Sequence, residues 1–146
     1  MDFAYSTLIL TKEEVSFLAG AMGIDKLYGN FDSGEELTEK GLYNILKSLI
    51  AKEFVICEED AYVIDKQVRH MIEFMRDSLY QKVYGGNDNT LPVKCIYFSE
   101  DRALVCEQGY VSENELHLFE LSVDELWELL EEEGYSKEDF TENDTN

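Results

Sequence analysis

Residues 38–64 read TEKGLYNILKSLIAKEFVICEEDAYVI, and the spacing of the apolar residues changes partway along this stretch. With Thr38 as a suitable N-cap, the first half predicts a helix over about residues 39–52 that buries one face. The opposite face of this helix would expose Lys40, Asn44 and Lys47. The apolar residues that set the helical spacing are Leu42, Ile45, Leu46, Leu49 and Ile50.

The second half of the same stretch is typical of a β-hairpin. Two β-prone runs, residues 54–57 and 61–64, flank the acidic triplet Glu58-Glu59-Asp60. Because short β-prone runs joined by polar residues favour a tight reversal of the chain, the triplet is predicted to form a polar hairpin tip.

Two further amphipathic helices are predicted around this stretch. Thr11 and Glu14 have the spacing of a capping box, which opens a helix over residues 11–22 that stops at Gly23. Behind the hairpin, helical spacing of apolar residues predicts a third helix over residues 66–82. Its apolar positions are Val68, Met71, Ile72, Met75 and Leu79.

The C-terminal half changes from helical to strand-like spacing. Three β-prone runs predict a small antiparallel sheet. They span residues 93–98, 103–107 and 115–121. A second capping box, from Ser122 to Glu125, then opens a helix that stops at Gly134. Trp127 lies on the apolar stripe of this helix and is predicted to cover the sheet, with an interface role as the alternative.

These elements predict an α+β fold with a winged-helix-like N-terminal domain followed by a small antiparallel sheet and a C-terminal helix. A chain of 146 residues is long enough for one ordinary domain or two very small ones. The expected division is residues 1–84 for the first domain, 85–89 (GGNDN) for a linker, 90–135 for the sheet and helix, and 136–146 for an acidic tail.

The chain is strongly acidic, with 32 Asp and Glu against 12 Lys and Arg and a net charge of −20. This charge disfavours long-range attraction to nucleic acid or to an anionic membrane, so a basic or neutral protein is the expected partner. A homo-oligomer is compatible with the composition. Because the sequence lacks a signal-peptide pattern and a run approaching the ~20 apolar residues of a membrane span, we expect a cytoplasmic protein.

Motifs for catalysis, metal binding and nucleotide binding are missing from the sequence. His70 and His117 have no cysteine or carboxylate at ligand spacing, and the serines and glycines form no GxSxG, GxGxxG or P-loop motif. Cys57, Cys95 and Cys106 lack CxxC spacing and lie in apolar runs, which predicts buried free thiols. We therefore expect no enzyme activity, no metal and no cofactor.

The predicted helix over residues 39–52 and the hairpin that follows it resemble the recognition helix and wing of winged-helix domains. Together with the helices on either side, the resemblance covers about residues 8–83 and implies a winged-helix fold for this part of the chain. The acidic tip Glu58-Glu59-Asp60 departs from the DNA-binding members of that superfamily, in which phosphate contact favours Lys or Arg. With the later strands and helix added, the whole chain resembles type VII secretion-associated chaperones in the order of its elements.

We therefore expect a non-catalytic, protein-binding adaptor or chaperone-like protein. The candidate contact residues are Lys40, Asn44, Lys47 and Trp127. The alternative is a winged-helix transcriptional regulator that binds DNA with the helix over residues 39–52.

Overall fold

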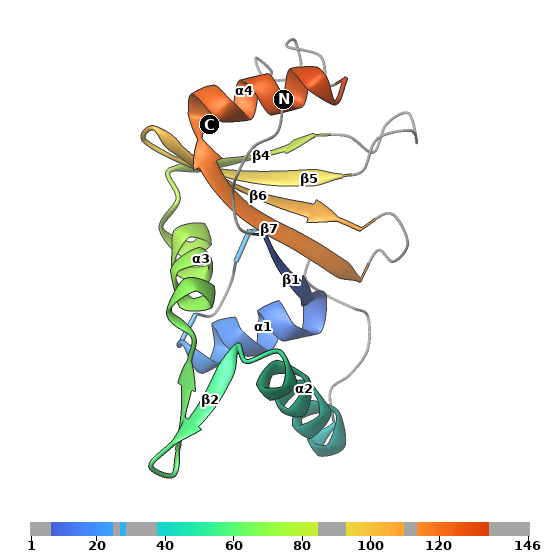
Figure 1. Cartoon of the computed structure of the whole chain (residues 1–146), viewed down its shortest axis with the longest axis vertical. Helices are drawn as coiled ribbons and strands as arrows, with labels where there is room; N and C mark the ends of the chain where they lie inside the picture. Colours follow the sequence, from blue (N-terminus) through green and yellow to red (C-terminus); the bar gives the residue numbers. More distant parts are fainter. Residues whose placement is uncertain (1–6, 25–26, 29–37, 85–92, 110–113, 135–146) are drawn as a thin grey trace.

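The computed structural model describes residues 7–24, 27–28, 38–84, 93–109 and 114–134, as drawn in Figure 1. Four helices and seven strands are found in these ranges. In chain order they are β1 (Leu8–Thr11), α1 (Lys12–Ala21), α2 (Glu39–Ala51), β2 (Val55–Glu58), β3 (Ala61–Ile64), α3 (Lys66–Asp77), β4 (Tyr80–Tyr84), β5 (Lys94–Ser99), β6 (Arg102–Gln108), β7 (Glu115–Ser122) and α4 (Val123–Glu132).

A five-stranded antiparallel sheet forms the centre of the molecule, with the strand order β1-β7-β6-β5-β4. The three strands predicted after residue 90 are confirmed as β5, β6 and β7. The predicted strand number was wrong, because β1 and β4 join the same sheet from within residues 1–84. The expected boundary at residues 85–89 thus falls between paired strands, and those five residues lie outside the described ranges.

The helix predicted over residues 66–82 ends earlier, at Asp77. Ser78 has an extended backbone (φ −61°, ψ 147°), and its hydroxyl donates to the carbonyl of Met75 at 3.0 Å. Tyr80–Tyr84 then pairs with β5. Helical spacing continues as far as Leu79, but strand pairing overrides it, since a β-prone segment beside an available strand gains a full ladder of hydrogen bonds.

Both faces of the sheet are apolar and both are covered by helices. Along β5 the side chains alternate, so that Ile96 and Phe98 belong to one buried cluster and Tyr97 to the other. The cluster containing Phe98 includes the buried residues of α4, and the cluster containing Tyr97 includes those of α1 and α3. The layers are therefore α4, the sheet, and α1 with α3, as Figure 1 shows.

Helix α4 is fixed to the sheet at both of its ends. The predicted capping box is present, with Ser122 and Glu125 exchanging side-chain to backbone hydrogen bonds of 2.9 and 3.1 Å. At the other end, the fully buried Lys94 of β5 pairs with Glu107 at 3.0 Å and with Glu133 at 2.9 Å. Two carboxylates compensate the cost of burying the ammonium group, and the contact holds the end of α4 against the sheet.

Trp127 packs against the sheet, in agreement with the sequence-based prediction. It is partly buried against the cluster beneath α4, and its ring centroid lies 6.1 Å from that of Phe98. Leu126 and Leu130 beside it are fully buried. The indole therefore contributes to the core between α4 and the sheet.

The cysteines are free, as predicted, but they differ in burial. Cys106 is buried, Cys95 is partly buried, and Cys57 in β2 is exposed, so the prediction of a buried thiol was wrong for Cys57. Burial raises the pKa of Cys95 to about 11 and also raises the pKa of Cys106. Both of these thiols are protonated at neutral pH.

The N-terminal half contains the predicted helices and hairpin. Helix α1 begins with the predicted capping box between Thr11 and Glu14, α2 begins at Thr38 as its N-cap, and the hairpin β2–β3 follows α2. The α+β class and the antiparallel sheet are therefore confirmed, and the winged-helix arrangement stays a prediction. Within the described residues, no helix combines the length and apolar character that a membrane crossing requires.

Helix α3 is joined to the sheet by one carboxylate. Glu120 of β7 accepts from Nε of Arg102 at 2.9 Å, and its other oxygen lies 2.6 Å from Nε2 of His70 on α3. Partial burial alone would raise the pKa of Glu120, but the contacts with His70 and Arg102 hold that pKa below its ordinary value. The ionised form of Glu120 therefore stabilises the contact between α3 and the sheet.

We expect Trp127→Ala to lower the free energy of unfolding by about 3 kcal/mol, because a large side chain is removed from a partly buried site. Denaturant unfolding would measure the change. Glu128→Ala on the exposed side of the same helix is the control and should unfold at nearly the wild-type midpoint. A wild-type midpoint for Trp127→Ala would contradict the core role of the indole.

We also expect stability to depend on the ionisation of Glu120. Because its folded-state pKa lies below its unfolded-state value, the contribution is fully present above the unfolded-state pKa and is lost as the pH falls through the folded-state pKa. Glu120→Gln should therefore reduce the loss of stability in acid. Urea unfolding over the acidic pH range would measure this, with Glu128→Gln as the exposed control. An unchanged acid dependence in Glu120→Gln would contradict the assignment.

Candidate protein-binding surface

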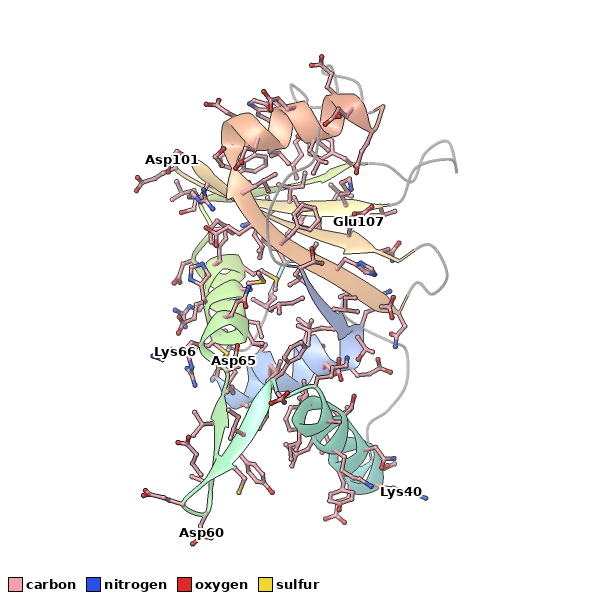
Figure 2. All side chains as sticks on the ribbon, in the orientation of Figure 1. Lys40, Asp60, Asp65, Lys66, Asp101 and Glu107 are labelled. Atoms are coloured by element: carbon pink, nitrogen blue, oxygen red, sulfur yellow. The ribbon has the colours of Figure 1, made fainter. Side chains whose placement is uncertain are left out.

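Exposed apolar side chains gather on α2 and the hairpin β2–β3. Eleven large hydrophobic residues are exposed in the part of the chain that the structure describes, and six belong to these two elements. We call their combined surface the helix–hairpin end, and its exposed apolar residues are Leu42, Tyr43, Ile50, Ile56, Tyr62 and Val63. Figure 2 places this end, marked by Lys40 on α2 and Asp60 at the hairpin tip, away from α4.

A single buried carboxylate holds α2 in place. Glu14 of α1 accepts a hydrogen bond of 2.7 Å from the hydroxyl of Ser48 and forms an ion pair of 2.6 Å with Lys52. The same carboxylate accepts from the backbone N–H of Thr11 at 2.9 Å, within the capping box. Its side chain is only 2% exposed, so all of these contacts lie in a largely desolvated setting in which charged hydrogen bonds are strong.

Helix α2 buries less of its apolar face than the sequence predicts. Leu49 is fully buried and Ile45 and Leu46 are partly buried, but Leu42 and Ile50 are 39% and 40% exposed. The prediction of one buried stripe was therefore wrong for these two residues. Leu42 and Ile50 are exposed because α2 contacts the core mainly around Leu49, and the apolar face of the helix is larger than the area of that contact.

The polar face of α2 is exposed as predicted. Lys40, Asn44 and Lys47 all face solvent. The ammonium group of Lys47 lies 5.6 Å from the centre of the Tyr43 ring, within the range of a cation–π contact. The ring itself stays 61% exposed, so its free face is available to another molecule.

The hairpin shows apolar side chains on both of its faces. The pairs Val55 with Ile64 and Cys57 with Tyr62 share one face, since side chains alternate along a strand. Val55 is buried in the core, whereas Tyr62, farther out on the same face, is 60% exposed.

The opposite face of the hairpin carries the pair Ile56 and Val63, which are 44% and 43% exposed. A two-stranded hairpin with apolar residues exposed on both faces is marginally stable by itself. Its outer part therefore presents apolar surface that a bound protein would bury.

The hairpin turn has an unusual sequence for its geometry. Glu59 and Asp60 both have positive φ angles, 45° and 66°. A two-residue hairpin turn with two positive φ angles normally uses Asn-Gly or Asp-Gly, because other side chains crowd the backbone there. The predicted polar tip is confirmed in position. Glu59 and Asp60 adopt these positive φ angles at a cost in backbone strain, and strained residues of this kind are typical of functional segments.

The structure brings together three of the four predicted contact residues. Lys40, Asn44 and Lys47 lie on α2, whereas Trp127 belongs to α4 and packs against the sheet; α4 lies at the other end of the molecule from α2 (Figure 1). The exposed apolar residues of the hairpin were not predicted as contact residues. Their signal was present in the two strands, which are apolar at nearly every position and do not alternate as a half-buried strand does.

Among the described residues, no group of three or more His, Cys, Asp or Glu side chains is placed to hold a metal ion. The helix–hairpin end offers instead aromatic rings, aliphatic side chains and a charged rim. Comparisons with protein families, with curated proteins and with solved structures found no match to the chain.

We expect the double substitution Glu59→Asn with Asp60→Gly to raise the free energy of unfolding by about 1 kcal/mol, because both residues suit positive φ angles better. Thermal and denaturant unfolding would measure the gain. The control is Glu58→Asn, which changes charge at the tip outside the two strained positions. Equal stability of the double variant and the wild type would show that the turn is not strained.

Proposed function

We propose that the chain is a non-catalytic adaptor or chaperone-like protein that binds another protein through its helix–hairpin end. The observation that supports this function best is the gathering of exposed apolar side chains on α2 and the hairpin. Exposed apolar residues that are scattered singly are ordinary, but a group of them on neighbouring elements is typical of an interaction site.

The residue types at this end suit a protein interface. Tyr43 and Tyr62 are the largest exposed side chains there, and tyrosine is enriched among the residues that contribute most to binding. Lys40, Asn44 and Lys47 would form a polar rim beside them. The resemblance of the element order to type VII secretion-associated chaperones supports the chaperone-like form of this proposal.

A cytoplasmic location is part of the proposal. The three cysteines are free, although Cys95 and Cys106 occupy directly opposed positions on neighbouring strands. Free thiols persist in a reducing compartment, which supports this location.

A DNA-binding regulator is the second candidate. It is favoured by the exposure of Lys40, Asn44 and Lys47 on one helix, which the winged-helix resemblance would place against DNA. The three carboxylates of Glu58, Glu59 and Asp60 at the hairpin tip, and the net charge of −20, oppose it by repelling phosphate groups. Protein binding is therefore the better supported function.

Site-specific photo-crosslinking would test the proposal. A photoreactive phenylalanine analogue at Tyr62, on the full chain in its native cells, should give a discrete adduct with one protein. The same analogue at the exposed residue Tyr80, which lies on β4, is the matched control and should not give this adduct. Cys57→Lys should reduce the yield at Tyr62, because Cys57 is exposed on the same face of the hairpin and a charge would enter the apolar surface there.

Two results would overturn protein binding through this end. One is crosslinking at Tyr62 that is weak, diffuse and insensitive to Cys57→Lys. The other is sequence-selective binding of duplex DNA tighter than about micromolar at physiological salt, beyond the usual non-specific range. Loss of that DNA binding in Lys40→Ala and Lys47→Ala variants would then favour the regulator.

A further inference from the structure

Strand β4 forms one edge of the central sheet and carries exposed apolar residues. Within the described ranges, no strand pairs with it on the side away from β5 (Figure 1). Tyr80 and Val83 of β4 are 50% and 49% exposed, and Leu79 directly before the strand is 66% exposed. A sheet edge with exposed apolar side chains is a site at which another strand can add.

The hydrogen-bond pattern shows which backbone groups face outward. The N–H of Gln108 donates to the carbonyl of Val93 at 3.1 Å, so odd-numbered residues of β5 direct their backbone groups toward β6. Because these directions alternate along an antiparallel strand, even-numbered residues of β5 direct theirs toward β4.

The register of β4 extends this pattern to the edge of the sheet. Tyr80, Lys82 and Tyr84 stand opposite even-numbered residues of β5 and therefore direct their backbone groups inward. Gln81 and Val83 direct theirs away from the sheet. For the backbone N–H groups of Gln81 and Val83, the described residues offer no acceptor.

The other edge of the sheet differs, because the protein's own side chains cover it. On β1, the outward carbonyl of Ile9 accepts from the ammonium group of Lys52 at 3.4 Å. The N–H of Thr11 donates to Glu14. A lysine over an edge strand is a common protection against strand addition. The contrast indicates that β4 is the edge available for pairing.

We propose that β4 pairs with β4 of a second copy of this chain in antiparallel orientation, with Gln81 opposite Gln81 of the second copy. This register joins outward-facing backbone groups on both strands, as a hydrogen-bonded pair requires. It places Tyr80 opposite Lys82 of the second copy. Leu79, whose N–H donates to the carbonyl of Phe98 at 2.7 Å, stands opposite Val83 of the second copy and can only accept a hydrogen bond from it. Each pairing occurs twice about the two-fold axis.

The charges of the strand favour this register. Tyr80–Tyr84 contains one lysine and no acidic residue, so the strand avoids the like-charge contacts that are expected elsewhere on a chain of net charge −20. With Gln81 at the axis, the two copies of Lys82 face tyrosine rings rather than each other, and a lysine beside an aromatic ring is favourable.

Two properties of the dimer follow from its size and charge. A five-residue strand buries a small interface, below the roughly 1,000 Å² of stable complexes, so the dimer is weak and populated at high protein concentration. Because the remote surfaces of both copies are acidic, screening by salt strengthens association. An interface held by ion pairs would weaken with salt instead.

Analytical ultracentrifugation of the full chain over a range of concentration and salt tests the dimer. The wild type should show a monomer–dimer equilibrium that shifts toward dimer as salt is raised. Val83→Pro removes an outward N–H without removing a bond to β5, and it should weaken association about tenfold or more. Val83→Lys should act in the same direction, whereas Val63→Lys on the hairpin is the matched control and should associate like the wild type.

Cysteine crosslinking tests the register. In a Cys57→Ser background, Gln81→Cys should form an intermolecular disulfide with oxidised glutathione. The reason is that opposed residues in a hydrogen-bonded pair lie about 5.5 Å apart between Cα atoms, within disulfide range. Lys82→Cys should crosslink poorly. Circular dichroism would confirm that each variant is folded.

A monomeric wild type at every concentration, equal association of Val83→Pro and wild type, or crosslinking at position 82 in preference to 81 would each overturn the proposal. Photo-crosslinking at Tyr62 should be unchanged in Val83→Pro, because β4 and the helix–hairpin end are separate surfaces. Failure of the dimer and failure of the proposed adaptor function are therefore distinguishable.

Discussion

The five-stranded sheet is apolar on both faces, and covering both faces is the constraint on which the rest of the structure depends. Helix α4 covers one face, and α1 with α3 cover the other. The buried ammonium group of Lys94 and the carboxylate of Glu120 add polar links between the helices and the sheet. Because α1, α3 and α4 pack on the two faces of the sheet, α2 and the hairpin are the elements that project away from it.

The projecting part is nevertheless held at a defined place. The carboxylate of Glu14 accepts from the N-cap residue of α1, from Ser48 of α2 and from Lys52 directly after α2, so one buried group links the start of α1 to α2. Because the hairpin follows α2 after a short connection, the same contacts set where its strands begin. The helix–hairpin end is thus a positioned surface, which suits recognition of a partner with little reorganisation.

The two exposed apolar surfaces of the molecule differ in chemistry. At the helix–hairpin end, tyrosines and aliphatic side chains lie near lysines on α2 and carboxylates at the hairpin tip. On β4 the outward groups are mainly backbone N–H and C=O groups, accompanied by a few apolar side chains. Side-chain chemistry gives the first surface its selectivity, whereas the second surface suits any strand of compatible sequence, including its own.

The sequence by itself determined the helix starts at Thr11, Thr38 and Ser122 and the strands after residue 90, because capping and side-chain period are local properties. Tertiary structure decided that residues 80–84 form a strand and not the end of a helix. It also decided that Leu42 and Ile50 stay exposed on α2. Pairing with β5 and the extent of the core depend on residues distant in the chain. The local spacing of apolar residues therefore cannot predict the strand at residues 80–84 or the exposure of Leu42 and Ile50.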